Sequence, residues 1–587
     1  MAQDIRAELI GLLRHALRSV APNAVDTTIQ LERPRDPTHG DFSSNLALQL
    51  ARELKRNPRE IAQLLLCELP PSPRLIKAEI AGAGFINFTL AADTKTAIVA
   101  EVLAAGTGFG RSSLGQGRKI QVEFVSANPT GPLHVGHGRG AAYGASLAAL
   151  LAFAGWDITR EFYVNDAGRQ MDILAVSTWL RYLESHGISI PFPPNGYQGD
   201  YVRGMAEQMR VAHGEKFVRP AEAVLAGTPG LPATERSDDE AGKQREVHLD
   251  ALIYNAKIAL GADWDYVHRH ALTEQLADCR DDLEAFGVRH DVWFSEQALF
   301  DTGLVARCID QLEKSGHVYR QNGARWFRST AFGDEKDRVV QRENDLYTYF
   351  ASDIAYHLNK FERGFDQIIN VWGADHHGYI PRVKGALQAL GLDPDKLHVA
   401  LVQFAVLYRN GQKASMSTRS GEFVTLRSLR GEVGNDACRF FYALRKSDQH
   451  LDFDLDLATS QTNENPVYYI QYAHARICSV IQQWGGDERE LGACNLARLD
   501  SPRELALASR LGEFPAVIET AARELSPHQI AFYLKELAAE FHAWYNAERM
   551  LVEDGELRDA RVAMAATVRQ VIRNGLGILG VSCPTSM

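Results

Sequence analysis

The sequence predicts an α/β protein with three parts: a central Rossmann-like parallel sheet with insertions, an α+β domain before it, and an all-α helical bundle after it. Strand-like and helix-like segments alternate from residue 120 to about residue 457, which is typical of a doubly wound parallel sheet. Beyond residue 461, one helical segment follows another. A chain of 587 residues is long enough for several domains. We expect these domains to comprise residues 1–115, 116–460 and 461–587, with an insertion at about 187–260.

The composition is typical of a globular protein in an aqueous compartment, with 45% hydrophobic and 23% charged residues. A net charge of −11 argues against a protein that coats nucleic acid, although it allows a focused basic groove. The seven cysteines form no C-x-x-C pair, which favours reduced thiols over a zinc site or disulfides. The apolar runs are too short for a membrane span, and the first residues are unlike a secretory signal. We therefore expect a cytoplasmic protein without a membrane partner.

The first domain combines three helices with a pair of strands. Apolar residues recur at helical spacing between residues 5 and 17. Residues 40–44 lead into a second helix that ends near residue 51, and Pro58 begins a third. Residues 76–80 and 85–88 have strand patterns on either side of two glycines. Five glycines between residues 105 and 119 indicate a linker to the central domain.

The central domain begins with a strand at residues 119–125, which a proline- and glycine-containing turn separates from a helix. Such a strand, turn and helix start form an anion site, because the first helical N–H groups point at the turn. His134 and His137 lie three residues apart at this helix start, where both can face one phosphate. Gly136 leaves room for a flat purine against the backbone. The four residues alone are also compatible with two surface histidines on a loop.

Polar residues follow two further strands of this domain. Asn165-Asp166-Ala167-Gly168 follows the strand at 158–164, and Gly373-Ala374-Asp375-His376-His377-Gly378 follows the strand at 367–372. Polar side chains at the carboxyl ends of parallel strands lie at the ligand crevice, so the second cluster favours a site over a structural role. The polar loop at 409–421 is either a solvated surface loop or a source of cations for a polyphosphate.

The C-terminal helices are expected at residues 466–483, 502–513, 514–525, 527–548 and 559–576. Many aromatic residues occur in them. We expect most of these rings to lie in the core and a few to provide surfaces on which nucleic-acid bases stack.

Six motifs in this order resemble those of the arginyl-tRNA synthetases, a family of class I aminoacyl-tRNA synthetases. The motifs are residues 122–129 leading to His134-Val135-Gly136-His137, then Asn165–Gly168, Leu346–Asp353, Trp372–His377, Ser415–Arg419 and Tyr472–Arg476. The resemblance implies an N-terminal domain that touches the tRNA elbow, a catalytic domain and an anticodon-binding bundle. It also implies a monomer that uses ATP with Mg²⁺ to ligate L-arginine to tRNA(Arg) through an arginyl-adenylate, and that activates arginine only when tRNA is bound.

The resemblance also implies roles for individual residues. The ATP-binding set is His134, Gly136, His137, Gly373, Asp375, Met416 and Ser417. The arginine-binding set is Asp353 and Glu296 with Tyr349 at the guanidinium, and Glu123, Ser126, Asn128 and His376 at the α-amino and carboxylate end. Carboxylates arranged for a planar guanidinium would be left half satisfied by a lysine ammonium. At the C-terminus, Tyr545 and Met587 resemble residues that shape the anticodon pocket. The sequence contains no set of metal-binding residues, and the Mg²⁺ that the resemblance implies would be carried by the phosphates of ATP.

One motif departs from the family pattern. The Lys-Met-Ser-Lys-Ser loop of class I synthetases reads Ser415-Met416-Ser417-Thr418-Arg419 here, so the second lysine is missing. Our hypothesis is that Lys413 or Arg419 supplies its charge, which completes a catalytic set with the two histidines of the signature. Two alternatives remain open. One is another nucleotidyl-transferring enzyme without tRNA, and the other is a catalytically inactive relative that only binds RNA.

Overall fold

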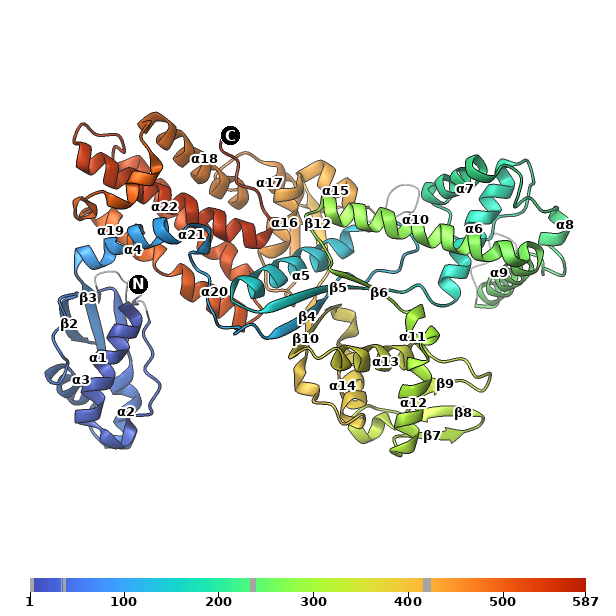
Figure 1. The fold of residues 1–587 in the computed structure, drawn as a ribbon, viewed down its shortest axis with the longest axis horizontal. Coiled ribbons are helices and arrows are strands. Elements are labelled where there is room, and N and C mark those ends of the chain that lie inside the picture. Colours follow the sequence, from blue (N-terminus) through green and yellow to red (C-terminus); the bar gives the residue numbers. More distant parts are fainter. Residues whose placement is uncertain (1–4, 33, 35–38, 233–238, 415–423) are drawn as a thin grey trace.

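The computed structural model describes residues 5–32, 34, 39–232, 239–414 and 424–587. A small N-terminal module lies at one end of the molecule, the parallel sheet lies near its centre, and the C-terminal bundle packs beside the sheet (Figure 1). Two further groups of elements extend from the sheet on the side away from the bundle (Figure 1). The predicted fold class, an α/β protein with an α+β domain before it and a helical bundle after it, is confirmed.

The N-terminal module packs three helices against a three-stranded antiparallel sheet of order β1-β3-β2. Its elements are α1 (Ile5–Val20), β1 (Phe42–Ser44), α2 (Leu46–Leu54), α3 (Pro58–Cys67), β2 (Leu75–Ala81) and β3 (Phe85–Leu90). The stretch before α2 was expected only to lead into a helix, yet it forms β1. A strand of three residues is too short to show the alternation that identifies strands in a sequence.

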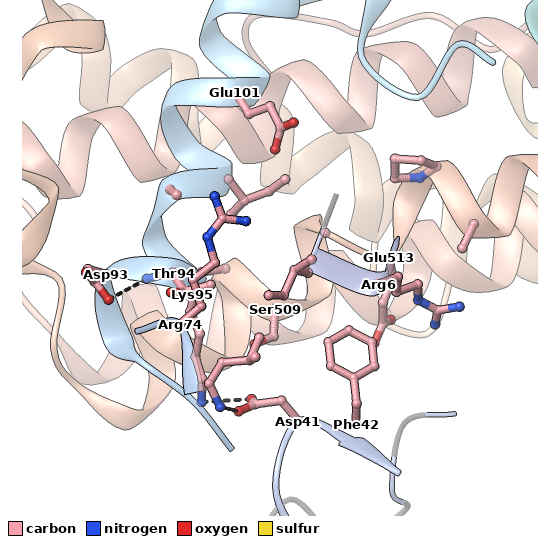
Figure 2. A pocket seen from close by; sticks show the side chains of 18 of the residues that line it. Arg6, Asp41, Phe42, Arg74, Asp93, Thr94, Lys95, Glu101, Ser509 and Glu513 are labelled. Atoms are coloured by element: carbon pink, nitrogen blue, oxygen red, sulfur yellow. Dashed lines mark hydrogen bonds and ion pairs between the residues drawn. The ribbon is translucent and has the colours of Figure 1, made fainter. Parts of the chain in front are cut away.

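Helix α4 (Ala92–Ala105) follows the module directly and packs on helices of the C-terminal bundle. Lys95, on its first turn, forms an ion pair of 2.7 Å with Asp41 of the module, and both side chains are largely buried. The other carboxylate oxygen of Asp41 accepts a hydrogen bond from the backbone N–H of Leu90. A cavity of about 780 Å³ lies between the module, α4 and the bundle, with this ion pair at its edge (Figure 2).

The central sheet contains five parallel strands in the order β11-β10-β4-β5-β6. These strands are β4 (Lys119–Glu123), β5 (Asp157–Val164), β6 (Val292–Ser295), β10 (Gln367–Gly373) and β11 (Leu397–Val402). Strands β5 and β6 extend from one side of β4, and β10 and β11 from the other. The strand order therefore reverses at β4, which is where open α/β sheets bind their ligands.

Helices connect successive strands of the sheet. Helix α5 (Val135–Phe153) connects β4 to β5. Between β5 and β6 lie α6 (Arg169–Ser185), α7 (Asp200–His213), α8 (Ala221–Val224), α9 (Asp239–Leu260) and α10 (Trp264–Ala285). Between β6 and β10 lie α11 (Gln297–Asp301), α12 (Leu304–Lys314), β7 (Val318–Gln321), β8 (Ala324–Phe327), β9 (Arg338–Gln341) and α13 (Tyr349–Glu362), and α14 (Ile380–Ala389) precedes β11.

A second small sheet and the bundle complete the chain. After β11 come β12 (Ala405–Arg409), β13 (Gln412–Lys413), α15 (Leu426–Val433), α16 (Asn435–Ala443), β14 (Leu451–Asp454) and α17 (Leu455–Thr459). The bundle contains α18 (Pro466–Trp484), α19 (Pro502–Leu511), α20 (Phe514–Arg523), α21 (His528–Ala547) and α22 (Gly555–Leu579). One continuous hydrophobic core joins the central sheet, α5 and α16 to these bundle helices. Within the described ranges, no helix has both the length and the apolarity needed to cross a lipid bilayer.

Candidate active site

The two signature histidines lie at the start of α5 with their rings stacked, 3.7 Å between centroids. Nδ1 of His134 accepts a hydrogen bond from the N–H of Gly136, and Nδ1 of His137 accepts one from the N–H of His134. Each neutral ring therefore carries its proton on Nε2, from which it can donate to a phosphate. A Cβ at Gly136 would lie 2.8 Å from Cε1 of His134, so the stacked ring requires glycine there.

Burial keeps both imidazoles neutral. It lowers the pKa of His134, and it lowers the pKa of His137 to about 3 with a smaller contribution from the neighbouring ring. These groups stay uncharged through the physiological range. They can act as hydrogen-bond donors at the helix N-terminus, where the dipole already favours an anion.

A strained turn separates β4 from the signature. The strand ends at Glu123 and not at Val125 as expected, because Val125 (φ 72°) and Ser126 (φ 43°) adopt left-handed conformations that no strand can hold. Hydrogen bonds to the end of β5 and to the residue after its last position stabilise this turn. The Ser126 hydroxyl donates to Glu123 and accepts from the N–H of Tyr163, and Asn165 donates to the carbonyl of Ser126.

The next residue of that motif, Asp166, orients the end of β6. It accepts hydrogen bonds from the Ser295 hydroxyl and from the N–H of Gln297. These two contacts flank Glu296, the first predicted guanidinium ligand. Glu296 is 3% exposed, and one of its oxygens accepts from the Ser352 hydroxyl on α13.

The second predicted guanidinium ligand, Asp353, lies on α13 and faces the same region. The Tyr379 hydroxyl donates a hydrogen bond to it. Tyr163, at the end of β5, lies beside these carboxylates. The Tyr163 hydroxyl and Oε2 of Glu296 are buried and have no hydrogen-bond partner among the described residues other than each other. The hydroxyl has a single proton to donate, whereas the carboxylates offer several acceptor positions, so the site can still accept hydrogen bonds from a ligand.

The site contains excess negative charge. Burial above all, with a further contribution from the carboxylates of Glu296 and Glu123 and against the opposing hydrogen bond from Tyr379, raises the pKa of Asp353 to about 7. Burial also raises the pKa of Glu296. A cation bound between these groups would restore the charge balance, which is what a guanidinium can do.

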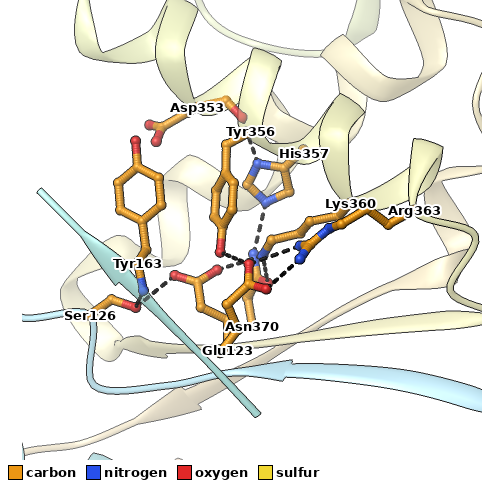
Figure 3. A network of polar contacts seen from close by, with 10 residues as sticks. Glu123, Ser126, Tyr163, Asp353, Tyr356, His357, Lys360, Arg363 and Asn370 are labelled. Atoms are coloured by element: carbon orange, nitrogen blue, oxygen red, sulfur yellow. Dashed lines mark hydrogen bonds and ion pairs between the residues drawn. The ribbon is translucent and has the colours of Figure 1, made fainter. Parts of the chain in front are cut away.

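Behind these ligands lies a buried polar network (Figure 3). The ammonium of Lys360, which is fully buried, donates to Oε2 of Glu123 at 2.5 Å and to Oδ1 of Asn370 at 2.7 Å. Arg363, the residue that follows the last residue of α13, forms a bidentate pair with the buried Glu161. The network joins α13 to the carboxyl halves of three strands of the sheet.

The remaining predicted residues of the central domain lie around this crevice with different exposure. Gly373 ends β10, and Asp375 and His376 follow it in a short 3₁₀ helix with their side chains 65% and 58% exposed. Asn128 lies exposed in the loop after the strained turn. Tyr349 is the first residue of α13, four positions before Asp353, and is 65% exposed.

Of the residues expected to act from the signature loop and its neighbourhood, Lys413 is the one that the described residues include. Lys413 ends the short strand β13, where it pairs with Tyr408, and its side chain is exposed. Met416, Ser417 and Arg419 lie outside the described residues.

In the bundle, Arg476 connects several aromatic rings. Its guanidinium lies 4.5 Å from the ring centroids of both Tyr472 and Tyr545, and it contacts His542. Tyr545 is half-buried in this cluster, while Met587 at the C-terminus is 53% exposed. A partly exposed arrangement of rings around one cation is suited to stacking with bases.

Three residues of the central site were missed in the sequence: Tyr163, Lys360 and Tyr379. Tyr163 immediately precedes the Val164-Asn165-Asp166 strand end, so its position was a usable signal. Phe404 was missed as well. It follows β11, is 51% exposed, and lies within 3.3 Å of where a Cβ at Gly136 would be.

The fold and the site together define a class I aminoacyl-tRNA synthetase. The family model described as "tRNA synthetases class I (R), catalytic domain" matches residues 98–192 and 261–477, interrupted over the segment that carries α7, α8 and α9. The model described as "Arginyl tRNA synthetase N terminal domain" matches residues 7–90, and "DALR anticodon binding domain" matches residues 470–587.

Proteins that match the whole chain show which class I synthetases it resembles. The chain is 78% identical to the arginine–tRNA ligase of Dechloromonas aromatica and 69% identical to that of Azoarcus sp., over the full length of both partners. The solved Thermus thermophilus arginyl-tRNA synthetase is 25% identical, with a TM-score of 0.72, and the alignment covers 99% of this chain and 100% of that one. The chain belongs to the arginyl-tRNA synthetase family.

Proposed function

We propose that the crevice at the carboxyl edge of the central sheet is where this chain joins L-arginine to tRNA with ATP. Membership of the family makes the chain an arginine–tRNA ligase of protein synthesis, which rules out an enzyme without tRNA. The observation that carries the assignment of the site is the group of carboxylates with raised pKa values, Glu296 and Asp353, at the point where the strand order reverses.

In the first step, a carboxylate oxygen of arginine attacks the α-phosphorus of ATP and pyrophosphate leaves. Such a reaction depends mainly on positioning and charge stabilisation. We propose that His134 and His137 donate from Nε2 to the phosphates, and that Gly136, Gly373 and Asp375 bind the nucleoside. Met416 and Ser417 would contact the nucleotide from the signature loop. Mg²⁺ would enter with ATP and neutralise phosphate charge, since the described residues contain no cluster able to hold a metal ion by themselves.

Arginine would lie with its guanidinium between Asp353 and Glu296, beside Tyr349. Its α-amino and carboxylate groups would contact Glu123, Ser126, Asn128 and His376. In the second step, a ribose hydroxyl at the end of the tRNA attacks the carbonyl carbon of the adenylate and AMP leaves. Residues 1–115 would contact the tRNA elbow, and the bundle from residue 461 would bind the anticodon with Tyr545 and Met587. We further propose that the enzyme acts as a cytoplasmic monomer.

The decisive test is aminoacylation of purified tRNA with arginine or lysine. Loss of one charged hydrogen bond costs about 1.5–3 kcal/mol, so two lost at the carboxylates predict a preference for arginine of at least about 100-fold in kcat/KM. Glu296→Gln should reduce this preference. Comparable use of lysine would contradict the guanidinium site. Loss of the arginine preference in wild-type enzyme and an unchanged preference in Glu296→Gln are thus the two results that count against the assigned site.

The missing lysine of the signature loop has its own test. We propose that Lys413 or Arg419 supplies the positive charge that stabilises the leaving pyrophosphate. Alanine at the residue responsible should lower ATP–pyrophosphate exchange, measured with tRNA present, by about 100-fold. Arg409→Ala is a matched control, because Arg409 lies on the same hairpin but is paired with Glu432. Unchanged exchange in both the Lys413 and Arg419 variants would reject the hypothesis.

A further inference from the structure

A fully buried lysine occupies the centre of the network beneath the arginine site (Figure 3). A buried ammonium is tolerated only when it is paired and hydrogen-bonded, and Lys360 meets this condition through Glu123 and Asn370. The resemblance assigned no role to Lys360, and the reaction described above does not use it. Its hydrogen-bond partner Glu123 lies at the α-amino end of the proposed arginine site, and its partner Asn370 connects to the guanidinium end.

Toward the α-amino end, Lys360 fixes one oxygen of Glu123 while the other oxygen receives the Ser126 hydroxyl. Ser126 and the preceding Val125 hold left-handed conformations that side chains rarely adopt. Such backbone persists only when its surroundings hold it in place. The lysine therefore supports the turn through the carboxylate.

Toward the guanidinium end, the donors and acceptors form a chain with one direction. Asn370 accepts from Lys360 and donates from Nδ2 to Nε2 of His357, 2.8 Å away. Burial lowers the pKa of His357 to about 3, so its ring is neutral and its Nδ1–H donates to the carbonyl of Asp353 at 2.7 Å. Each member fixes the orientation of the next, as in cooperative hydrogen-bond networks.

We propose that Lys360 is a positioning residue for arginine activation. It holds Glu123 and the strained turn at the α-amino end, and through Asn370 and His357 it fixes the turn of α13 that carries Asp353. The inference rests on the proposed function, in which the α-amino group of arginine lies at Glu123.

The chain offers a matched control three residues further on, at the C-terminal end of the same helix. Arg363 forms a bidentate pair with Glu161, whose side chain is fully buried and also accepts from Tyr356. Loss of Arg363 leaves a buried carboxylate without its cation, as loss of Lys360 does. Glu161, however, is not among the residues proposed to contact arginine.

The experiment measures KM for arginine and for ATP by ATP–pyrophosphate exchange with tRNA present. Lys360→Met should raise KM for arginine by about 10- to 100-fold, the equivalent of one or two charged hydrogen bonds, and leave KM for ATP within about twofold. Arg363→Met should leave both values within about threefold, whatever its effect on thermal stability. Equal effects of the two substitutions on KM for arginine would overturn the proposal.

A second comparison remains decisive if Lys360→Met alone does not fold. The double variant Lys360→Met/Glu123→Gln removes both charges, so no unpaired ion is left in the interior. Its KM for arginine should exceed that of Glu123→Gln by no more than about threefold, because the two side chains act as one unit. A larger rise would overturn the proposal.

The single variant Glu123→Gln distinguishes an error in the proposed position of the α-amino group from an error in the proposed role of Lys360. If it leaves KM for arginine unchanged, the proposed position of the α-amino group is wrong. If it raises KM for arginine while Lys360→Met behaves like Arg363→Met, only the role of Lys360 is wrong.

Discussion

The excess negative charge of the arginine site predicts a pH dependence that belongs to one residue. The pKa of Asp353 is about 7, raised first by burial and then by Glu296 and Glu123. The guanidinium of arginine stays protonated throughout the working range, so the substrate does not titrate with it. Below pH 7 the empty site holds a neutral acid that must lose its proton before it can pair with arginine. We therefore expect kcat/KM for arginine to fall about tenfold for each pH unit below 7.

Two substitutions should shift this acid limb, the fall of kcat/KM for arginine below pH 7, in opposite directions along the pH axis. Glu296→Gln removes a neighbouring negative charge, so the pKa of Asp353 should fall and the limb should shift to lower pH. Tyr379→Phe removes the hydrogen bond that stabilises the carboxylate, so the limb should shift to higher pH. Both variants keep Asp353, which makes the direction of the shift informative even where activity is reduced.

The assay is ATP–pyrophosphate exchange with saturating ATP and tRNA, at pH values from about 5.5 to 8.5. Calorimetry adds an independent measure, because binding of arginine should release about 0.9 proton at pH 6 and about 0.1 at pH 8. The ATP profile is the internal control. The pKa of His137 lies near 3, so KM for ATP should show no limb near neutrality. A flat arginine profile, or shifts of the same sign in both variants, would refute the reasoning.

Three further predictions concern other parts of the molecule. Gly136→Ala places a Cβ 2.8 Å from the first signature histidine, so we expect KM for ATP to rise by about tenfold or more in exchange assays, with tRNA binding unchanged. Arg476→Met removes the cation that lies over Tyr545, and we expect filter-binding affinity for tRNA to fall by about 5- to 30-fold while arginine activation with saturating tRNA is kept. Lys95→Met leaves Asp41 largely buried without its cation, so the midpoint of thermal unfolding should fall by several degrees, and addition of Asp41→Asn should restore part of the loss.

Much of the fold was predictable because its elements are long and periodic. Helices of the bundle such as α18 and α21 begin and end within a residue or two of their expected positions, since a proline or an asparagine cap precedes an apolar repeat. The end of β4 was not predictable. Val125 is a β-branched residue that favours strands, and only tertiary contacts force it into a left-handed conformation.

The buried residues of the site were harder to predict from the sequence than the residues around its opening. Asp353, Tyr356, His357 and Lys360 follow one another at helical spacing on α13, and Arg363 continues the spacing just beyond the helix, a pattern that normally indicates a solvated face. Here that face lies against the sheet, because Glu123, Glu161 and Asn370, on three of its strands, supply its partners. Periodicity identifies the helix, but it cannot distinguish a polar face in water from one that completes a buried network.

The same arrangement explains why the proposed arginine site should be destabilising while no ligand is bound. Three carboxylates near one tyrosine repel one another, and Tyr163 can donate only one hydrogen bond to them. A guanidinium satisfies several acceptors at once with a planar set of donors, whereas the compact ammonium of lysine leaves at least one buried group unpaired. Discrimination then comes from the penalty that the wrong substrate leaves behind. Rigidity is a condition for this penalty, because carboxylates free to turn toward water would escape it. Tyr379 holds the Asp353 carboxylate through a hydrogen bond, and the buried chain from Lys360 holds the turn of α13 that carries this residue.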